Sequence, residues 1–405
     1  MERGARDAGR ALATVKRAAL AAILCAALPI ATPAASPVAS ADAAYAAGDF
    51  ATALSGYQDA VRRSPNDPAA HVGRARLALY GNDLDTAERE AARALQLDPS
   101  NDAAARLQTQ IAQRREASVP AGLPPGVDQV TIPFIQLDPL PLVLVHVNGV
   151  KAFFIVDTGA PNVVLDPGFA RLLHVKSTPS GTGTFAGGKT ATVGTGTVQY
   201  FDIGAVSAMN VPVTILPTRK FPGFGKRVDG IVGMGFLMHY TATIDYGGKA
   251  LMLRARSPEV SASLESQAAA SGAVAVPFWL VGDHFVFARG HIGDAPESLL
   301  LVDTGLAGGG VMPTQATVDA AQLQLQTNKA TTGLGGGGAV QVIPLVVPLV
   351  SLGAFQRQNV AGFVDAQGSA LAHFPFTVGG VVSHQFFEPG TLTYDFTSMR
   401  LYLTP

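Results

Sequence analysis

The chain carries the tripeptide Asp-Thr-Gly twice, each time directly after a run of apolar residues. Asp157 follows FFIV, and Asp303 follows LLLV. An ionisable residue that ends a buried strand is costly unless it is paired or has a chemical role. Two such residues in matching settings predict two carboxylates at one site, where they share a proton and activate a water molecule. The alternative is a pair of ordinary strand-end turns, in which Asp and Gly are common for conformational reasons.

The sequence around the two motifs also repeats. IPFIQLDPLPLVLVHVNG precedes the first copy and VPFWLVGDHFVFARGHIG precedes the second. Residues 130–256 and 274–405 are therefore predicted to be two copies of one lobe, joined by a linker at 257–273. Both copies contain short runs rich in Val, Ile, Thr and Phe, broken by Gly and Pro. This pattern is typical of β-strands and hairpins.

Four segments of the two copies resemble the pepsin and retropepsin group of aspartic proteases. They are VDTGA at 156–160, DGIVG at 229–233, VDTGL at 302–306 and GGVV at 379–382. The resemblance implies a mainly β, bilobal acid protease fold with one catalytic aspartate in each lobe, Asp157 and Asp303. In that group the motif threonines form hydrogen bonds across the lobe interface, and the motif glycines allow a close backbone approach. The residues to which the resemblance gives this support of the dyad are Thr158, Gly159, Thr304 and Gly305.

Two positions of the second copy depart from the family pattern. Position 306 is Leu, where pepsin-like enzymes carry Ser or Thr and retropepsins carry Ala. Ser383 stands where the first copy has Gly233, and a Cβ there is expected to crowd the backbone near the dyad. Both departures favour an alternative in which the second lobe has lost catalytic competence.

The segment GTFAGGKT, from Gly183 to Thr190, matches the phosphate-binding pattern G-x-x-x-x-G-K-[ST]. That loop must open a helix, but the residues that follow alternate Gly with β-branched side chains and are a poor helix start. We therefore predict a Gly-rich hairpin. The resemblance implies a substrate-covering flap here, and a second one around 333–338, although each can also be an ordinary turn. The flap residues assigned to substrate binding are Gly183, Phe185, Gly187 and Gly188.

Residues 1–41 have the features of a secretory signal peptide: scattered Arg and Lys, an apolar core, and the cleavage-site pattern Ala39-Ser40-Ala41. We expect an exported protein, periplasmic or secreted, which starts near Asp42 and has no membrane span after cleavage. A retained membrane anchor is the alternative. Cys25 is the only cysteine and lies in this segment, so the mature chain is expected to have neither disulfides nor a thiol nucleophile.

Residues 42–116 are rich in Ala, Leu, Arg and Glu and are predicted to be helical. They repeat with a period of 34, since Thr52-Ala53 matches Thr86-Ala87. This period resembles that of tetratricopeptide repeats and predicts a small all-α domain before the lobes. The helices either dock a protein partner or serve as a packing spacer. A Pro- and Gly-rich linker at 117–129 predicts that they fold apart from the lobes.

Composition narrows the function further. A formal net charge of −1 gives no basic field for nucleic acid. The eight His residues include no close ligand pair, so we expect neither a metal nor a cofactor. The resulting hypothesis is an exported aspartic endopeptidase that hydrolyses a peptide or protein substrate by metal-independent general acid–base chemistry. The alternatives are a non-catalytic peptide-binding or scaffold protein that retains the protease fold, and a repeat protein for which the β region is a platform.

Overall fold

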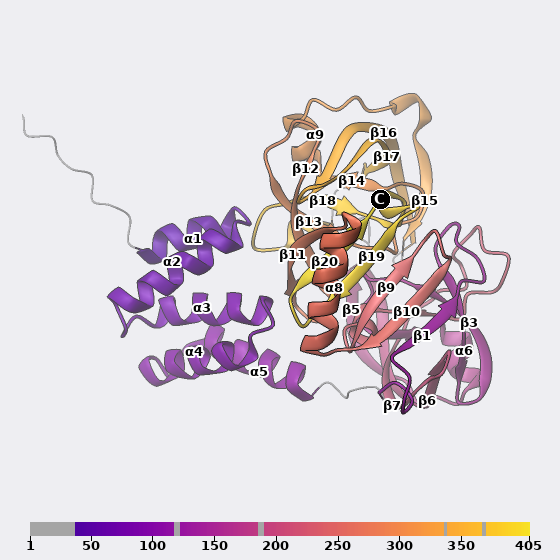
Figure 1. Cartoon of the computed structure of the whole chain (residues 1–405), viewed down its shortest axis with the longest axis horizontal. Helices are drawn as coiled ribbons and strands as arrows, with labels where there is room; N and C mark the ends of the chain where they lie inside the picture. The colour runs from indigo at the N-terminus through magenta and orange to yellow at the C-terminus, as the bar shows by residue number, and fades with distance from the viewer. Residues whose placement is uncertain (1–36, 117–121, 185–189, 336–337, 367–369) are drawn as a thin grey trace, which may run out of the picture. The chain divides into compact units, whose positions relative to one another are not determined.

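The computed structural model in Figure 1 describes residues 37–116, 122–184, 190–335, 338–366 and 370–405. All of them belong to one compact unit, residues 36–405. Strands dominate the unit, and helices gather at its N-terminal end, so the predicted fold class is confirmed. Within the described residues, no helix is long and apolar enough to cross a membrane.

Residues 37–116 form five helices: α1 (Pro37–Ala46), α2 (Phe50–Arg63), α3 (Pro68–Tyr80), α4 (Leu84–Leu97) and α5 (Asp102–Glu116). The 34-residue period has a direct structural cause in the helix caps. Asp49 accepts a hydrogen bond from the Thr52 amide at the start of α2, and Asp83 accepts one from the Thr86 amide at the start of α4. Each carboxylate satisfies a backbone donor that has no partner inside its helix.

The described residues of the first lobe form ten strands and two short helices. They are β1 (Gln129–Pro133), β2 (Leu142–Val147), β3 (Val150–Val156), β4 (Val163–Leu165), β5 (Thr178–Thr184), β6 (Thr190–Ile203), β7 (Val206–Ile215), β8 (Gly230–Val232), β9 (Tyr240–Asp245) and β10 (Ala250–Ala255), with α6 (Pro167–Leu172) and α7 (Met234–Leu237).

The second lobe repeats this order. Its elements are β11 (Val274–Val281), β12 (Phe285–Ile292), β13 (Ser298–Val302), β14 (Val311–Pro313), β15 (Thr331–Gly335), β16 (Gly338–Leu352), β17 (Phe355–Asp365), β18 (Val378–Val382), β19 (Thr391–Asp395) and β20 (Arg400–Thr404), with α9 (Gln315–Ala320), α10 (His384–Phe387) and two 3-10 turns, Thr327–Lys329 and Ala370–His373. Residues 257–273, expected as a linker, contain the helix α8 (Pro258–Ser271).

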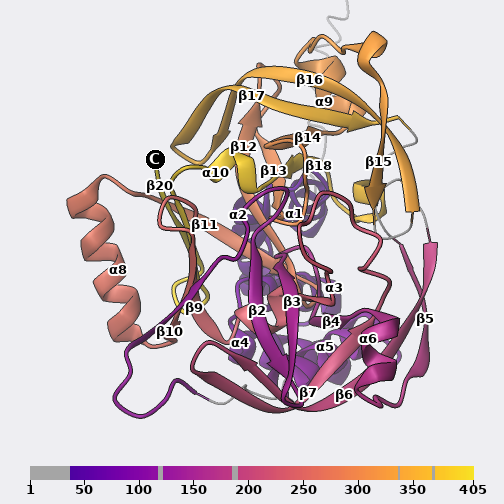
Figure 2. The ribbon, with the colours of Figure 1, turned by 90° about the vertical axis from the view of Figure 1, so that its right-hand side faces the viewer.

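The two lobes share one arrangement of three strands. In lobe one, β3 pairs in parallel with β8, and β8 pairs antiparallel with β4. In lobe two, β13 pairs in parallel with β18, and β18 pairs antiparallel with β14. Each Asp-Thr-Gly motif follows the first strand of its set, so the two motifs occupy equivalent positions. The lobes are joined where β9 pairs with β19, within a 13-stranded sheet that begins at β1 and ends at β15. Figure 2 labels β9 and β10 of lobe one and β11 and β20 of lobe two, which belong to this sheet.

The two Gly-rich segments form hairpins. β5 pairs antiparallel with β6, and β15 pairs antiparallel with β16. Thr190 begins a strand, so the phosphate-loop alternative, which requires a helix at this point, is wrong. Of the four predicted flap residues, Gly183 lies in β5, whereas Phe185, Gly187 and Gly188 lie outside the described residues.

The N-terminal helices and lobe two bury a common set of apolar side chains, which we call the shared cluster. Phe50 of α2 is at its centre, with ring centroids 4.9 Å from Phe376 and 5.6 Å from Trp279. The buried members are Ala41, Tyr45, Phe50, Ala53, Tyr57, Leu77, Tyr80, Val281, Phe287, Leu299, Leu301, Leu371, Phe376, Val378 and Val381. Such a common core contradicts the expectation that the helices fold apart from the lobes.

Hydrogen bonds reinforce this contact. The backbone amide of Thr377 donates to the carbonyl of Ala46 at 2.8 Å. Arg114 of α5 donates to the carbonyl of Leu79 at 2.7 Å and also to that of Gly282 in lobe two. Burial lowers the pKa of Arg114 to about 10, so its guanidinium stays charged at neutral pH. The helices are therefore fixed to lobe two by backbone, aromatic and charged contacts.

The predicted signal peptide meets the described structure at α1. Residues 1–36 lie outside the described residues, and α1 begins at Pro37. Ala41, the last residue before the predicted cleavage point, is 1% exposed in the shared cluster. Cleavage there would thus remove the first half of α1.

Candidate active site

The two motif aspartates meet between the lobes. Asp157 follows β3 and Asp303 follows β13, and the two carboxyl groups are hydrogen-bonded to each other. The glycines explain how they come so close. A Cβ placed on Gly159 would overlap the Asp303 carboxylate, and one placed on Gly305 would overlap that of Asp157. Only glycine leaves room for the opposite carboxylate at these two positions.

The surroundings of the two carboxyls favour a shared proton. Burial, and then the neighbouring charge of Asp303, hold the pKa of the Asp157 carboxyl well above its usual range. Burial likewise raises the pKa of Asp303, although the Gly305 amide partly opposes this by donating a hydrogen bond. Ionising both carboxyls would place two negative charges in hydrogen-bond contact, which is energetically unfavourable. The pair therefore holds one proton as a unit. Both residues remain partly accessible to solvent, as a water-activating site requires.

The threonines of the two motifs connect the lobes beneath the aspartates. The Thr158 amide donates to the Thr304 hydroxyl at 3.0 Å, and the Thr304 amide donates to the Thr158 hydroxyl at 3.0 Å. Each hydroxyl in turn donates to a backbone carbonyl of the opposite lobe, that of Val302 at 3.4 Å and that of Val156 at 3.5 Å. Both threonines are fully buried. This reciprocal set of bonds fixes the geometry of the dyad across the interface.

A fifth residue, Tyr394, contributes to this network and was not expected from the sequence. Its hydroxyl donates to the Thr158 hydroxyl at 3.1 Å, and its ring is fully buried in β19. The equivalent turn-flanking position in lobe one is Ile244, since Asp245 and Asp395 end matching strands. A polar group at an otherwise apolar repeat position is the signal that could have identified it.

Lobe two accommodates Ser383 through a longer loop. The strand after the motif starts six residues beyond Asp157 in lobe one, at Val163, but eight residues beyond Asp303 in lobe two, at Val311. Ser383 is fully buried, and its hydroxyl donates to the carbonyl of Leu306 at 2.8 Å. The expected crowding is therefore relieved by the extra loop residues. The Leu306 side chain packs against the shared cluster.

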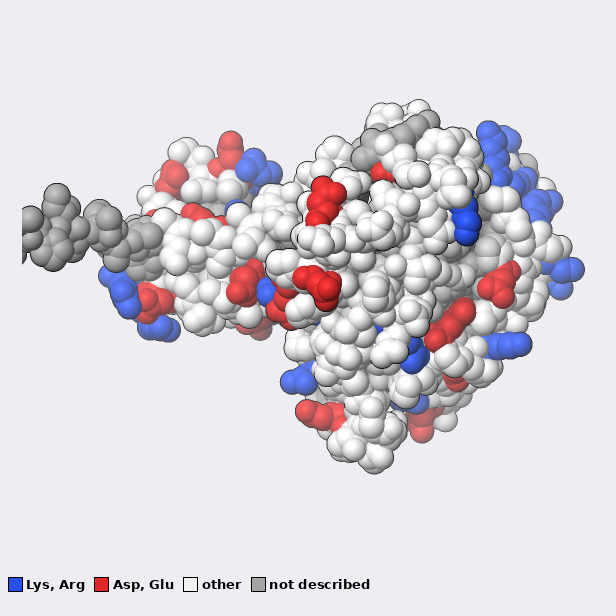
Figure 3. Space-filling view, turned by 90° about the horizontal axis from the view of Figure 1, so that it is seen from above, with Lys and Arg blue, Asp and Glu red and all other residues white. Residues whose placement is uncertain are grey.

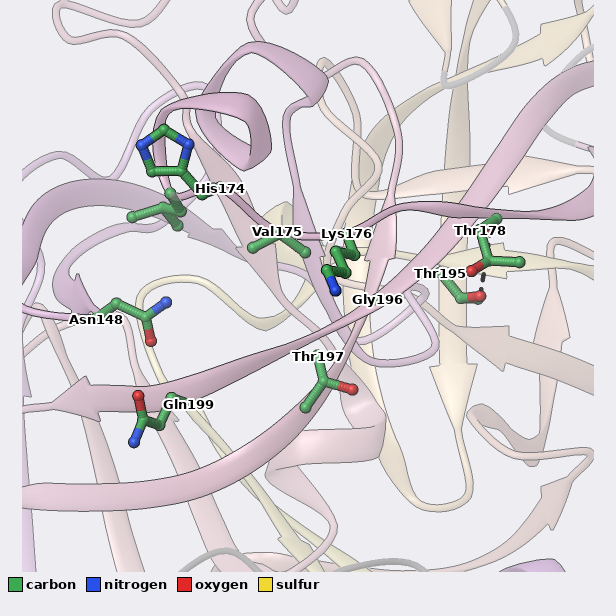
Figure 4. A pocket seen from close by; sticks show the side chains of 10 residues that line it. Asn148, His174, Val175, Lys176, Thr178, Thr195, Gly196, Thr197 and Gln199 are labelled. Atoms are coloured by element: carbon green, nitrogen blue, oxygen red, sulfur yellow. Dashed lines mark hydrogen bonds between the residues drawn. The ribbon is translucent and has the colours of Figure 1, made fainter.

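Two cavities lie apart from these motifs in the part of the chain that the structure describes. One, of about 630 Å³, lies beside β6 and the segment after α6, with His174, Lys176, Thr195 and Gln199 on its walls (Figure 4). The other, of about 440 Å³, lies between α5 and lobe one, where Arg114, Asn162 and Met209 contribute to its lining. Neither cavity is lined by a motif aspartate. Charged side chains are scattered among uncharged ones on the face in Figure 3, which agrees with a charged fraction of 15%.

Two family models match parts of the chain. The model described as Aspartyl protease matches residues 143–236, and the model described as Tetratricopeptide repeat matches residues 44–111. The chain combines tetratricopeptide repeats with a retropepsin-like aspartyl protease fold. The protease match contains Asp157 and the β5–β6 hairpin, whereas Asp303 lies in the second copy of the lobe, beyond the match.

The chain was also compared with solved structures and with curated proteins. One similar solved structure is a retropepsin-like aspartic protease from Rickettsia conorii, with 22% sequence identity. The similarity covers 31% of this chain and 90% of that chain, with a TM-score of 0.23. No curated protein matches the chain.

Proposed function

We propose that this protein is an exported aspartic endopeptidase with Asp157 and Asp303 as its catalytic pair. The observation that carries the proposal is the contact between two carboxyls from two equivalent strand ends, each seated against the glycine of the opposite motif. Such a pair holds a single proton between its two carboxyls. In this state the ionised member can accept a proton while the protonated member donates a hydrogen bond.

The reaction follows from that protonation state. The ionised aspartate takes a proton from a water molecule as its oxygen attacks the carbonyl carbon of the peptide bond. The protonated aspartate donates a hydrogen bond to the carbonyl oxygen as negative charge develops there. Transfer of a proton to the amide nitrogen then allows the C–N bond to break. Because the pair titrates as a unit, either aspartate can occupy either role.

A non-catalytic peptide-binding protein is the second candidate, on account of Leu306 and Ser383. Two features of lobe two support the catalytic alternative. Asp303 accepts a hydrogen bond from the Gly305 amide at 2.8 Å, just as Asp157 accepts one from the Gly159 amide at 2.8 Å. The Ser383 hydroxyl is also satisfied within the longer loop.

The decisive experiment measures cleavage of an unstructured protein across pH by the parent chain, Asp157→Asn and Asp303→Asn. We expect a bell-shaped profile on the acid side of neutrality, because activity requires the singly protonated pair. Each substitution should lower kcat/KM by at least about 1000-fold, and the double substitution should cost little more. The exposed Asp128→Asn is the control and should retain full activity.

Two outcomes would contradict parts of the proposal. Undiminished cleavage by Asp303→Asn would remove lobe two from the mechanism. A parent chain that binds the unstructured protein without cleaving it at any pH would favour the peptide-binding alternative. Export is tested separately, by sequencing the N-terminus of the native protein, where an intact Met1 would argue against it.

A further inference from the structure

A second group of ionisable side chains lies at the junction of the two lobes, apart from the aspartate pair. Asp138 belongs to the lobe-one segment between β1 and β2, His384 begins α10 in lobe two, and Glu388 follows that helix. Each side chain offers one metal-ligating atom, and these atoms all lie within 4.8 Å of one another. The last two residues are one helical turn apart, which brings their side chains to the same face.

The imidazole of His384 is held in one orientation. His384 is 0% exposed, and its Nδ1 lies 3.2 Å from the carbonyl oxygen of Leu306. A carbonyl oxygen only accepts hydrogen bonds, so Nδ1 carries the ring proton and Nε2 is left with a free lone pair. This is the arrangement that fixes the tautomer of a metal-binding histidine.

Two buried polar atoms of the group have no hydrogen-bond partner: Nε2 of His384 and Oε1 of Glu388. A buried polar atom without a partner is costly and requires an explanation. Charge adds to this cost, because the carboxylates of Asp138 and Glu388 lie close together and repel each other. No ion pair between the described residues supplies either carboxylate with a cationic side chain. A bound cation would satisfy all three groups at once.

We propose that Asp138, His384 and Glu388 form a binding site for a divalent transition-metal cation, of the class of Zn²⁺, that joins the two lobes. An imidazole with two carboxylates suits zinc better than magnesium or calcium, which prefer oxygen ligands alone. Zinc bonds to nitrogen and oxygen are about 2.0–2.2 Å long, so small side-chain rotations would bring the three atoms into the metal's first shell. Asp138 is exposed, which leaves a position for water.

The proposed site would also act on the backbone beside the catalytic pair. The Leu306 carbonyl accepts hydrogen bonds from both Ser383 and His384, and Leu306 directly follows the motif that contains Asp303. A metal on His384 would therefore stiffen this backbone as well as the lobe junction. The sequence predicts no metal here, because Asp138 lies 246 positions before His384 and only the fold brings them together.

The test uses the full chain carrying Asp157→Asn, so that self-cleavage is suppressed. Equilibrium dialysis against Zn²⁺, with the metal counted by mass spectrometry, should give one zinc per chain and a higher melting temperature. Adding Asp138→Asn, His384→Gln or Glu388→Gln should each weaken zinc binding by at least about 10-fold and reduce the thermal shift. His291→Gln, which changes an exposed histidine of β12, is the matched control and should bind zinc like its parent.

Failure of the parent to take up zinc would overturn the proposal. So would equal zinc binding by the Asp138→Asn, His384→Gln and His291→Gln chains. Because Asp138 is exposed, its substitution tests the site even if the buried His384→Gln chain does not fold. Neither result depends on peptidase activity.

Discussion

Thr158 bears more of the dyad's support than its partner Thr304. Its hydroxyl accepts hydrogen bonds from the Thr304 amide and the Tyr394 hydroxyl, and donates one to the Val302 carbonyl. Tyr394 thus makes the hydrogen bonds of the two motif threonines unequal. Loss of this hydroxyl would leave two buried donors without an acceptor, which is costly in a site that water does not reach.

We expect Thr158→Val to lower the free energy of unfolding by about 2–4 kcal/mol, since each abandoned buried donor costs roughly 1–3 kcal/mol. Thr158→Ser retains the hydroxyl and serves as the control, with a much smaller loss. Urea denaturation of both chains measures the difference. Equal stability of the two variants would show that the hydroxyl network contributes little.

The titration of the aspartate pair makes stability depend on pH. The pKa of Asp157 is raised by burial, so the folded chain holds a proton that the unfolded chain releases. By linkage, this stabilisation is fully present below about pH 4, near the pKa of an unfolded Asp, and is lost as pH rises through the raised pKa.

We therefore expect Asp157→Asn to raise the melting temperature near neutral pH by roughly 2–5 °C, because the amide never has to ionise in the buried site. The gain should shrink as the pH falls towards about 4, because the raised pKa of Asp157 keeps the parent's carboxyl protonated there. Calorimetry at the two pH values, with Asp128→Asn for comparison, measures this. A variant that is less stable than its parent at neutral pH would contradict the argument.

At the scale of elements, the sequence predicts the repeated strands well but not the loops between them. The two motifs and their flanking apolar runs are enough to predict two equivalent lobes, because the strand pattern and the spacing of the motifs repeat together. The sequence does not predict that the Ser383 side chain can be accommodated, since this depends on the two additional residues before β14. Comparing Ser383 with Gly233 shows only the change of side chain, and not that the loop facing it follows another path. The flap assignment of Gly183 and its neighbours stays a prediction.

This difference between the loops predicts opposite results for two exchanges. In lobe one, a Cβ on Gly233 would lie 2.6 Å from the carbonyl oxygen of Ala160, so Gly233→Ser should cost about 2–4 kcal/mol. In lobe two, Ser383→Gly removes only one hydrogen bond and should cost about 1 kcal/mol. Thermal unfolding compares them. Similar losses in both variants would show that the longer loop does not create the room we assign to it.

At the scale of the whole molecule, the helices and lobe two have a common interior. The sequence predicts helices with an internal repeat and a Pro-rich linker after them. These features together predict a separate domain. The sequence did not reveal that Phe50 and Phe376, 326 positions apart, would share one cluster. Amphipathic helices leave an apolar face to be covered, and sequence periodicity alone does not say what covers it.

We expect a chain that begins at Val127 to be insoluble, or to melt at least about 10 °C below the full chain, because it exposes the lobe-two half of the shared cluster. In the full chain, Phe50→Ala should cost about 3–5 kcal/mol. Trp279, the only tryptophan, lies in this contact, so its fluorescence reports the loss. Leu84→Ala, in the separate core of the helices, is the control and should leave that signal unchanged. A soluble, equally stable truncated chain would restore the separate-domain interpretation.

The shared cluster also sets an order of events during synthesis. Its first members, from Ala41 to Tyr80, leave the ribosome early, whereas Phe376, Val378 and Val381 are among the last residues made. Contacts between such distant segments form late, after the intervening chain has been synthesised. The strand that supports Asp303 therefore gains its apolar cover only when the chain is nearly complete. A nascent chain would lack the finished pair of aspartates, so under the proposed function it could not cleave its own unfolded segments before assembly ends.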